Sequence, residues 1–256
     1  MQGAVTGGGE HDRPGSAAPE PITVDPPPAP AVAPLPVALS DVTFLHWRYE
    51  PEVVRPLLPP GTRPDSADGA AYVGLVAFRM RSFGEFVQFN VRTYSVDQRK
   101  RRGVVFLAME ANRLPWVLAA RVARLPYRWS RVSLIRDVDQ LDYRLARRWP
   151  GPVGIGTRIR VRVGQPIEGN PLDHFLTARW RLHYRVHRIT LTATLTHDRW
   201  PLHAADLLGL HDELLTTAGL PPPTAPPINV LYSPGVRGRL GLPTPARRRV
   251  KACGRP

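Results

Sequence analysis

The chain has 256 residues, with 30 prolines, 21 glycines, one cysteine and a formal net charge of +14 at pH 7. No window approaches the roughly 18 apolar residues of a membrane-spanning helix, and the N-terminus lacks a basic segment followed by an apolar one, so the sequence predicts a cytoplasmic protein with no membrane contact. The single cysteine, Cys253, excludes a disulfide framework and a cysteine-ligated metal site.

The two ends of the chain differ in composition from the middle. Residues 1–38 are rich in Gly, Pro and Ala and hold too few large apolar side chains to offset the entropy of ordering, so we expect a disordered tail. Residues 244–256 carry five basic side chains and are also expected to be disordered. The remaining segment, 39–243, predicts one globular domain with a sizeable core.

Most predicted elements of this domain are strands. Alternating or continuous apolar runs predict strands over 42–49, 70–81, 86–96, 104–111, two or three between 131 and 147, 155–163, and a hairpin over 180–195. Short helices are predicted over 51–58, 116–124, 171–177 and 206–218. This succession predicts a mainly β fold with short helices, in which an antiparallel sheet closes into a barrel or curls into a sandwich.

The predicted strand 86–96 is the most informative segment. The period of two places Val87, Phe89 and Val91 on one apolar face. Polar side chains occupy the other face, which carries Gln88, Asn90, Arg92 and Tyr94 beside Phe86. This set suits a polar or anionic small molecule, and a solvated sheet face is the alternative interpretation.

The positive charge comes almost entirely from arginine, because only Lys100 and Lys251 are lysines. About +12 of the charge falls within residues 39–243, which favours contact with phosphates. Arginines 158, 160 and 162 alternate with apolar residues and predict a solvated basic face. No aromatic residues interleave with them, so the signal for nucleic-acid binding is weak.

Motifs for nucleotide, zinc-protease or hydrolase chemistry are absent, and we expect neither a metal nor a cofactor. His183 and His187 would lie about 13 Å apart along a strand, which does not suit a shared metal.

Several segments together resemble a known family. They are His46-Trp47, 57–61 (LLPPG), 68–75 (DGAAYVGL), 90–94 (NVRTY), 103–106 (GVVF), 125–127 (LPY), 175–179 (FLTAR), 197–202 (HDRWPL) and 233–236 (SPGV). In this order they resemble the YqjF-like family, bacterial proteins of unknown function in the acetoacetate decarboxylase-like superfamily. The resemblance implies a closed, double-layered antiparallel β-barrel with a central cavity.

The lysine Schiff base of acetoacetate decarboxylases does not transfer to this sequence. Lys100 is the only lysine of the predicted domain, and it lies between Arg99 and Arg101 in a charged turn. A solvated lysine stays protonated and is a poor nucleophile. Gln88 also stands where this family usually has glutamate, and Glu110 where aspartate is usual.

The barrel implied by the resemblance would direct the polar face of strand 86–96 into the cavity. The period of two on the next strand then places Glu110 where it could meet Arg92 across the hairpin. We expect Gln88, Asn90, Arg92, Tyr94, Tyr127, Arg179 and Ser233 to bind ligand, and Glu110 and His197 to be the catalytic candidates for proton transfer. A buried structural network that closes the barrel is the alternative.

Two functions remain open at this point. One is a protein that binds a small polar or anionic organic molecule, with lyase- or hydrolase-like action on organic acids or carbonyl compounds as an extension. The other is an interaction protein that binds nucleic acid or an anionic surface through its basic face and C-terminal tail. The sequence predicts no oligomeric state.

Overall fold

The computed structural model describes residues 18–28 and 32–246. Its strands are β1 (Leu35–Tyr49), β2 (Thr62–Pro64), β3 (Ala71–Arg81), β4 (Glu85–Asp97), β5 (Arg102–Ala111), β6 (Tyr127–Asp137), β7 (Gln140–Trp149), β8 (Gly156–Ile167), β9 (Arg181–Val186), β10 (Ile189–His197), β11 (Leu202–Asp212), β12 (Asn229–Leu240) and β13 (Thr244–Pro245). The helices are α1 (Pro51–Val54), α2 (Leu114–Val122), α3 (Pro171–Thr177) and α4 (Leu214–Thr217), and a 3-10 turn spans Arg55–Leu57. The prediction of a mainly β fold with short helices is confirmed.

One of the predicted helices is wrong. Residues 206–212 belong to β11, which pairs with β8, and the helix is reduced to α4. Ala205 and Leu207 pack against the core from β11, so the segment follows a strand period. Asp212 then accepts hydrogen bonds from the backbone N–H groups of Leu214 and Leu215, which starts the short helix.

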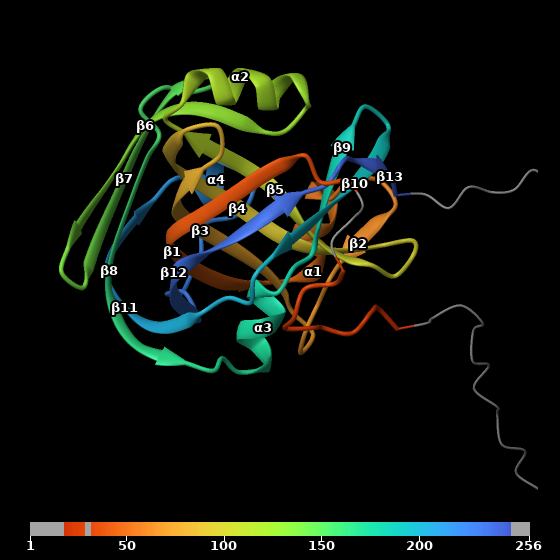
Figure 1. Ribbon diagram of the computed structural model, residues 1–256, viewed down its shortest axis with the longest axis horizontal. Coiled ribbons are helices and arrows are strands. Elements are labelled where there is room, and N and C mark those ends of the chain that lie inside the picture. The colour runs from red at the N-terminus through yellow and green to blue at the C-terminus, as the bar shows by residue number, and fades with distance from the viewer. Residues whose placement is uncertain (1–17, 29–31, 247–256) are drawn as a thin grey trace, which may run out of the picture.

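The strands form one hydrogen-bonded sheet in the order β13-β10-β9-β5-β6-β7-β8-β11-β12-β1-β3-β4-β2. Two further pairings, β10 with β12 and β4 with β5, join strands that lie far apart in this order. Most pairs are antiparallel, but β5 pairs in parallel with β6 and, at one residue, with β9. In Figure 1, α2 and α3 lie at opposite ends of the strands, and the β6–β7 hairpin projects to one side.

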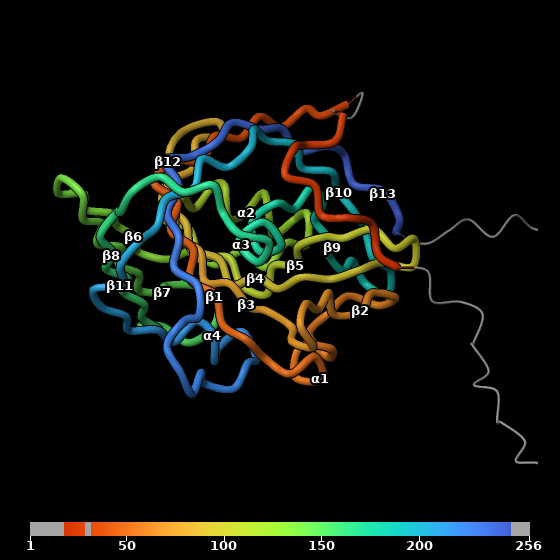
Figure 2. Tube along the Cα trace, turned by 90° about the horizontal axis from the view of Figure 1, so that it is seen from below, coloured from red at the N-terminus to blue at the C-terminus, as the bar shows by residue number. Residues whose placement is uncertain are grey.

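Strands β1, β3 and β4 are buried on both faces. Leu45, Leu75 and Phe89 pack into one apolar cluster, whereas Phe44 and Val76 pack into another on the opposite face of the same strands. Figure 2 shows these strands in the interior, with other segments on both sides. Side chains on either face of β4 are therefore removed from water, which decides the environment of its polar residues.

A β-bulge interrupts the pairing of β4 with β5 between Val91 and Arg92. Val91 lies opposite Ala108, but Arg92 lies opposite Phe106, so Leu107 is the extra residue. An extra residue reverses which face each following side chain occupies.

Described residues before β1 contact the sheet. The Nε1 of Trp180 donates to the carbonyl oxygen and hydroxyl of Thr23 at 3.1 and 3.0 Å, and Arg181 pairs with Glu20 at 2.5 Å. These residues belong to the predicted tail 1–38, and β1 begins at Leu35. Residues 1–17, 29–31 and 247–256 lie outside the described residues. They include parts of the predicted tail 1–38 and most of the predicted tail 244–256, with Arg247–Lys251.

Within residues 18–28 and 32–246, no helix combines the length and apolar character required to cross a membrane.

Candidate functional site

A cavity of about 80 Å³ lies among β1, β3, β4, β5, β10 and β12. Most of its wall is apolar and includes Phe44, Phe106 and Trp200. The polar side chains that reach it are Asn90, Arg92, Thr177, Arg179 and His197. Four of these five were among the residues expected to form the site.

The polar face of β4 is not a solvated surface. Gln88, Asn90, Arg92 and Tyr94 are all buried, and even the guanidinium-bearing Arg92 is only 9% exposed. The alternative interpretation of this face is therefore wrong, because the strand is covered on both sides. In contrast, arginines 158, 160 and 162 are exposed on β8, as predicted for a solvated basic face.

Arg92 is a buried cation without a carboxylate partner among the described residues. One Nη atom donates to the carbonyl oxygen of Leu176 at 2.9 Å, and its Nε is buried without a hydrogen-bond partner. The guanidinium carbon also lies 5.2 Å from the centre of the Phe44 ring and 5.7 Å from that of Tyr94. A buried charge and a buried unpaired donor both cost free energy, so this site favours an anionic acceptor.

The amide of Asn90 presents a second unpaired group at the same cavity. Its Oδ1 is buried and has no hydrogen-bond partner in the described part of the chain. The assignment of amide oxygen and nitrogen rests on the surrounding hydrogen bonds. In either orientation, Asn90 offers a hydrogen bond to a molecule in the cavity.

Arg179, unlike Arg92, has an acidic partner. Its Nη1 donates to Asp65 Oδ2 at 2.6 Å, and Arg102 pairs with the other carboxylate oxygen. Burial lowers the pKa of Arg179, and its guanidinium stacks on the rings of Tyr94 and Phe175 at 4.6 and 4.3 Å. The remaining Nε and Nη2 of Arg179 are buried and unpaired, so they add donors near the cavity.

His197 lies between the indole rings of Trp180 and Trp200, with ring centres 4.5 and 5.0 Å away. Its Nδ1 is 2.6 Å from the carbonyl oxygen of Asp198, which fixes the proton on that nitrogen and leaves Nε2 as the acceptor. Burial, with the charge of Arg92 as a further cause, lowers the pKa of His197 to about 4. The imidazole is therefore neutral at pH 7.

Behind Arg92, a hydrogen-bonded chain leads away from the cavity through His46, which the sequence-based selection missed. The hydroxyl of Tyr94 is 2.6 Å from the Leu176 carbonyl oxygen and 2.8 Å from His46 Nε2, and His46 Nδ1 is 3.0 Å from Asn229 Oδ1. Burial, and next the charge of Arg92, lower the pKa of His46 to about 3. The period of two, which places His46 on the face of Phe44, was the available signal.

Glu110 does not meet Arg92, which corrects the expectation from the sequence. Because of the bulge in β5, Glu110 lies opposite Phe89 on the other face. There it accepts hydrogen bonds from Arg147 Nε and Nη2 at 3.0 and 2.5 Å, and from Ser130 Oγ at 2.6 Å. Its carboxylate belongs to a buried ion pair outside the cavity.

Other expected site residues also lie outside the cavity wall. The Tyr127 hydroxyl donates to Gln88 Oε1 at 3.0 Å, and burial raises the pKa of this phenol to about 12. Ser233 is buried, and its Oγ accepts from the Gly235 N–H at 3.2 Å. Lys100 lies in the β4–β5 turn and is not among the residues that line the cavity.

Comparison with known proteins places this fold among relatives. A family model for DUF2071, described as an uncharacterized conserved protein, matches residues 37–237. The uncharacterized protein YqjF of Bacillus subtilis (strain 168) is 25% identical over 180 residues, which cover 65% of this chain and 74% of YqjF.

Two solved structures illustrate the likeness in fold. The enduracididine biosynthesis enzyme MppR complexed with pyruvate has a TM-score of 0.60 at 15% identity, over 86% of this chain and 93% of MppR. Acetoacetate decarboxylase from Legionella pneumophila subsp. pneumophila str. Philadelphia 1 has a TM-score of 0.60 at 13% identity, over 94% and 95% of the two chains. At this identity the likeness is one of fold.

Proposed function

This chain belongs to the DUF2071 family, and we propose that it binds a small organic acid in the cavity at Arg92. The observation that carries the proposal is the buried guanidinium of Arg92, which has an unpaired Nε and no carboxylate partner among the described residues. A carboxylate would accept charge-assisted hydrogen bonds from it and offset the cost of its burial.

The neighbouring groups narrow the ligand class. Asn90 offers one hydrogen bond, and the neutral His197 offers an acceptor at Nε2. A cavity of about 80 Å³ is small beside the roughly 300–1,000 Å³ of typical ligand pockets, so it suits a molecule of only a few non-hydrogen atoms. We therefore propose a short carboxylic acid with a neighbouring hydroxyl group, which can donate to His197 Nε2, or a neighbouring carbonyl group, which can accept from the amide of Asn90. The pyruvate bound to MppR belongs to this class.

The proposal includes a closed barrel around this cavity. Pairings β4–β5 and β10–β12 support it, because each joins strands far apart in the sheet order. The exclusion of water by closure would strengthen the interaction of Arg92 with an anion.

The low pKa of His197 favours a protein that binds the acid without converting it. A general base works best with a pKa near the working pH, and the pKa of His197 is held at about 4. Lys100 lies outside the cavity wall, so no amine in that wall can form a Schiff base.

The test is calorimetric titration with pyruvate, lactate and acetoacetate. We expect Arg92→Gln to weaken the tightest of them by about 10- to 100-fold, since hydrogen bonds to charged groups contribute about 1.5–3 kcal/mol. Arg160→Gln on exposed β8 is the matched control, which removes the same charge outside the cavity. An Arg92→Gln protein that is folded and binds as tightly as the parent protein would refute the proposal.

A further inference from the structure

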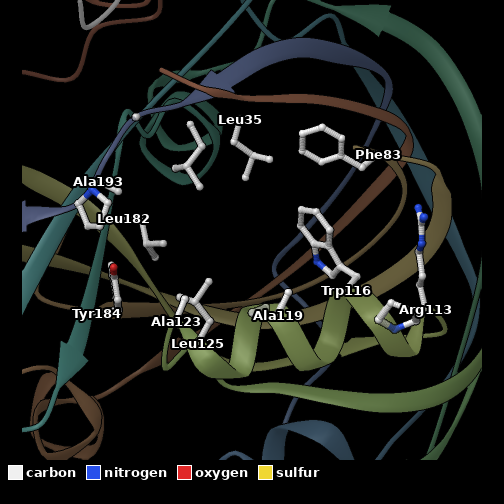
Figure 3. Close-up of a pocket in the computed structure, with 15 residues that line it drawn as sticks. Leu35, Phe83, Arg113, Trp116, Ala119, Ala123, Leu125, Leu182, Tyr184 and Ala193 are labelled. Carbon is white, nitrogen blue, oxygen red and sulfur yellow. The ribbon is translucent and has the colours of Figure 1, made fainter. Parts of the chain in front are cut away.

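A second, larger hollow lies between α2 and strands β1, β9, β10 and β12. Its volume is about 510 Å³, within the range of about 300–1,000 Å³ typical of ligand pockets. Figure 3 shows it as a groove with α2 along one side. The wall is almost entirely apolar and includes Leu35, Ala119, Ala123, Leu125 and Leu182.

Arg113 provides a cationic group at one end of this groove. Figure 3 shows it at the start of α2, beside Trp116 and on the side of the groove where Phe83 lies. The guanidinium forms no ion pair or hydrogen bond with any residue in 18–28 or 32–246, and its Nη1 is buried without a partner. It packs directly on Gly84, where a Cβ would lie 1.8 Å from that Nη1. The donor is thus held in place without an acceptor.

Phe83 is the second unusual feature at this end. Its side chain is 72% exposed although it lines an apolar groove, and its backbone has φ of 47°. The left-handed region is unfavourable for a bulky residue, so local backbone preference does not account for this conformation. A ligand that covers the ring would remove its apolar surface from water.

We propose that the groove binds an amphipathic carboxylic acid, such as a free fatty acid, with its carboxylate on Arg113 and its hydrocarbon chain along α2. Arg113 supplies charge complementarity at one end, and the alanines of α2 leave room for a chain between the helix and the strands. A neutral apolar ligand would leave the charge of the Arg113 guanidinium without a partner at the end of the groove, which explains the preference for an acid.

This site is separate from the cavity at Arg92 and does not depend on its function. The groove and the cavity are lined by neighbouring residues of the same strands, two positions apart and therefore on the same face. Leu35 and Ala193 line the groove, whereas Val37 and Leu195 line the cavity. Substitutions in one can therefore be compared with matched substitutions in the other.

Dodecanoate is the probe, titrated calorimetrically into the full chain below its micellar concentration, with 1-dodecanol as the neutral comparator. We expect one dodecanoate per chain, and about 10- to 100-fold weaker binding in Arg113→Gln with dodecanol little changed. Each methylene removed from the acid should weaken binding roughly three- to fourfold. Ala119→Trp should abolish binding by filling the groove, whereas Leu118→Trp on the exposed side of α2 should not.

Several results would overturn the proposal. The first is an absence of saturable dodecanoate binding. The second is a loss of dodecanoate affinity in Arg92→Gln as large as that in Arg113→Gln, which would place the acid in the cavity. Unchanged binding in Arg113→Gln or in Ala119→Trp would be the third. A dimer that Ala119→Trp dissociates, with no affinity for dodecanoate, would show that a second copy of the chain covers the groove.

Discussion

Replacement of Glu110 by glutamine distinguishes a structural role from a catalytic one. The Glu110 carboxylate is fully buried and accepts from Arg147, whose side chain is only 1% exposed. Glu110→Gln keeps the shape but removes the negative charge, so Arg147 would remain as a buried cation without its partner. Breaking such a pair costs about 3–5 kcal/mol, a large part of the stability of a typical domain.

Asp142 supplies the matched control. It pairs with Arg144 and Arg158, but both arginine side chains are about half exposed. Asp142→Asn should therefore cost no more than about 1 kcal/mol, because water screens exposed pairs. Urea unfolding of the parent protein and the two variants measures both costs at one pH.

Ligand binding by the same variants completes the experiment. Folded Glu110→Gln should bind the cavity ligand as tightly as the parent protein, because its carboxylate lies on the opposite face of β5 from Phe106. A Glu110→Gln protein of unchanged stability that no longer binds the acid would refute the structural role of this carboxylate. That result would place the carboxylate in the site.

Two further predictions concern pH and backbone. Burial lowers the pKa of His46 to about 3 and those of His183 and His197 to about 4, so the unfolded chain binds more protons than the folded one below pH 6.5. Their contribution to stability is therefore complete above pH 6.5 and is lost as the pH falls through about 4 for His183 and His197 and about 3 for His46. His197→Gln should reduce the slope of unfolding free energy at pH 5 by about 1.2 kcal/mol per pH unit, measured by urea titrations, and an unchanged slope would contradict the assigned pKa. Gly235 has φ of 132°, and a Cβ there would lie 1.9 Å from the Leu39 carbonyl oxygen. Gly235→Ala should lower the thermal midpoint by several degrees or prevent folding, and a midpoint equal to that of the parent protein would contradict the described contact.

The side-chain pattern of β4 could be predicted from the sequence, because the face of each residue follows from the strand period alone. Asn90 and Arg92 reach the cavity as that period requires. The neighbouring strand could not be predicted in the same way. One extra residue in β5 turns Glu110 to the other face, and no local pattern marks a bulge.

Long-range contacts explain the other differences between the sequence-based prediction and the structure. His46 contacts Asn229, which is 183 residues away in the chain, and Asp65 pairs with Arg179, which is 114 residues away. Such contacts depend on the register of whole strands. The strand character of residues 206–212 likewise depends on pairing with β8, which outweighs the local preference for helix.

Arg92 is proposed to hold an anion inside the cavity. The most direct measurement is a crystal structure of the chain soaked with pyruvate, compared with one of Arg92→Gln under the same conditions. We predict a carboxylate in hydrogen-bond contact with the Arg92 guanidinium, beside Asn90 and His197, and its loss in the variant. Pyruvate bound only elsewhere, with water paired to Arg92 in the cavity, would contradict this role of Arg92.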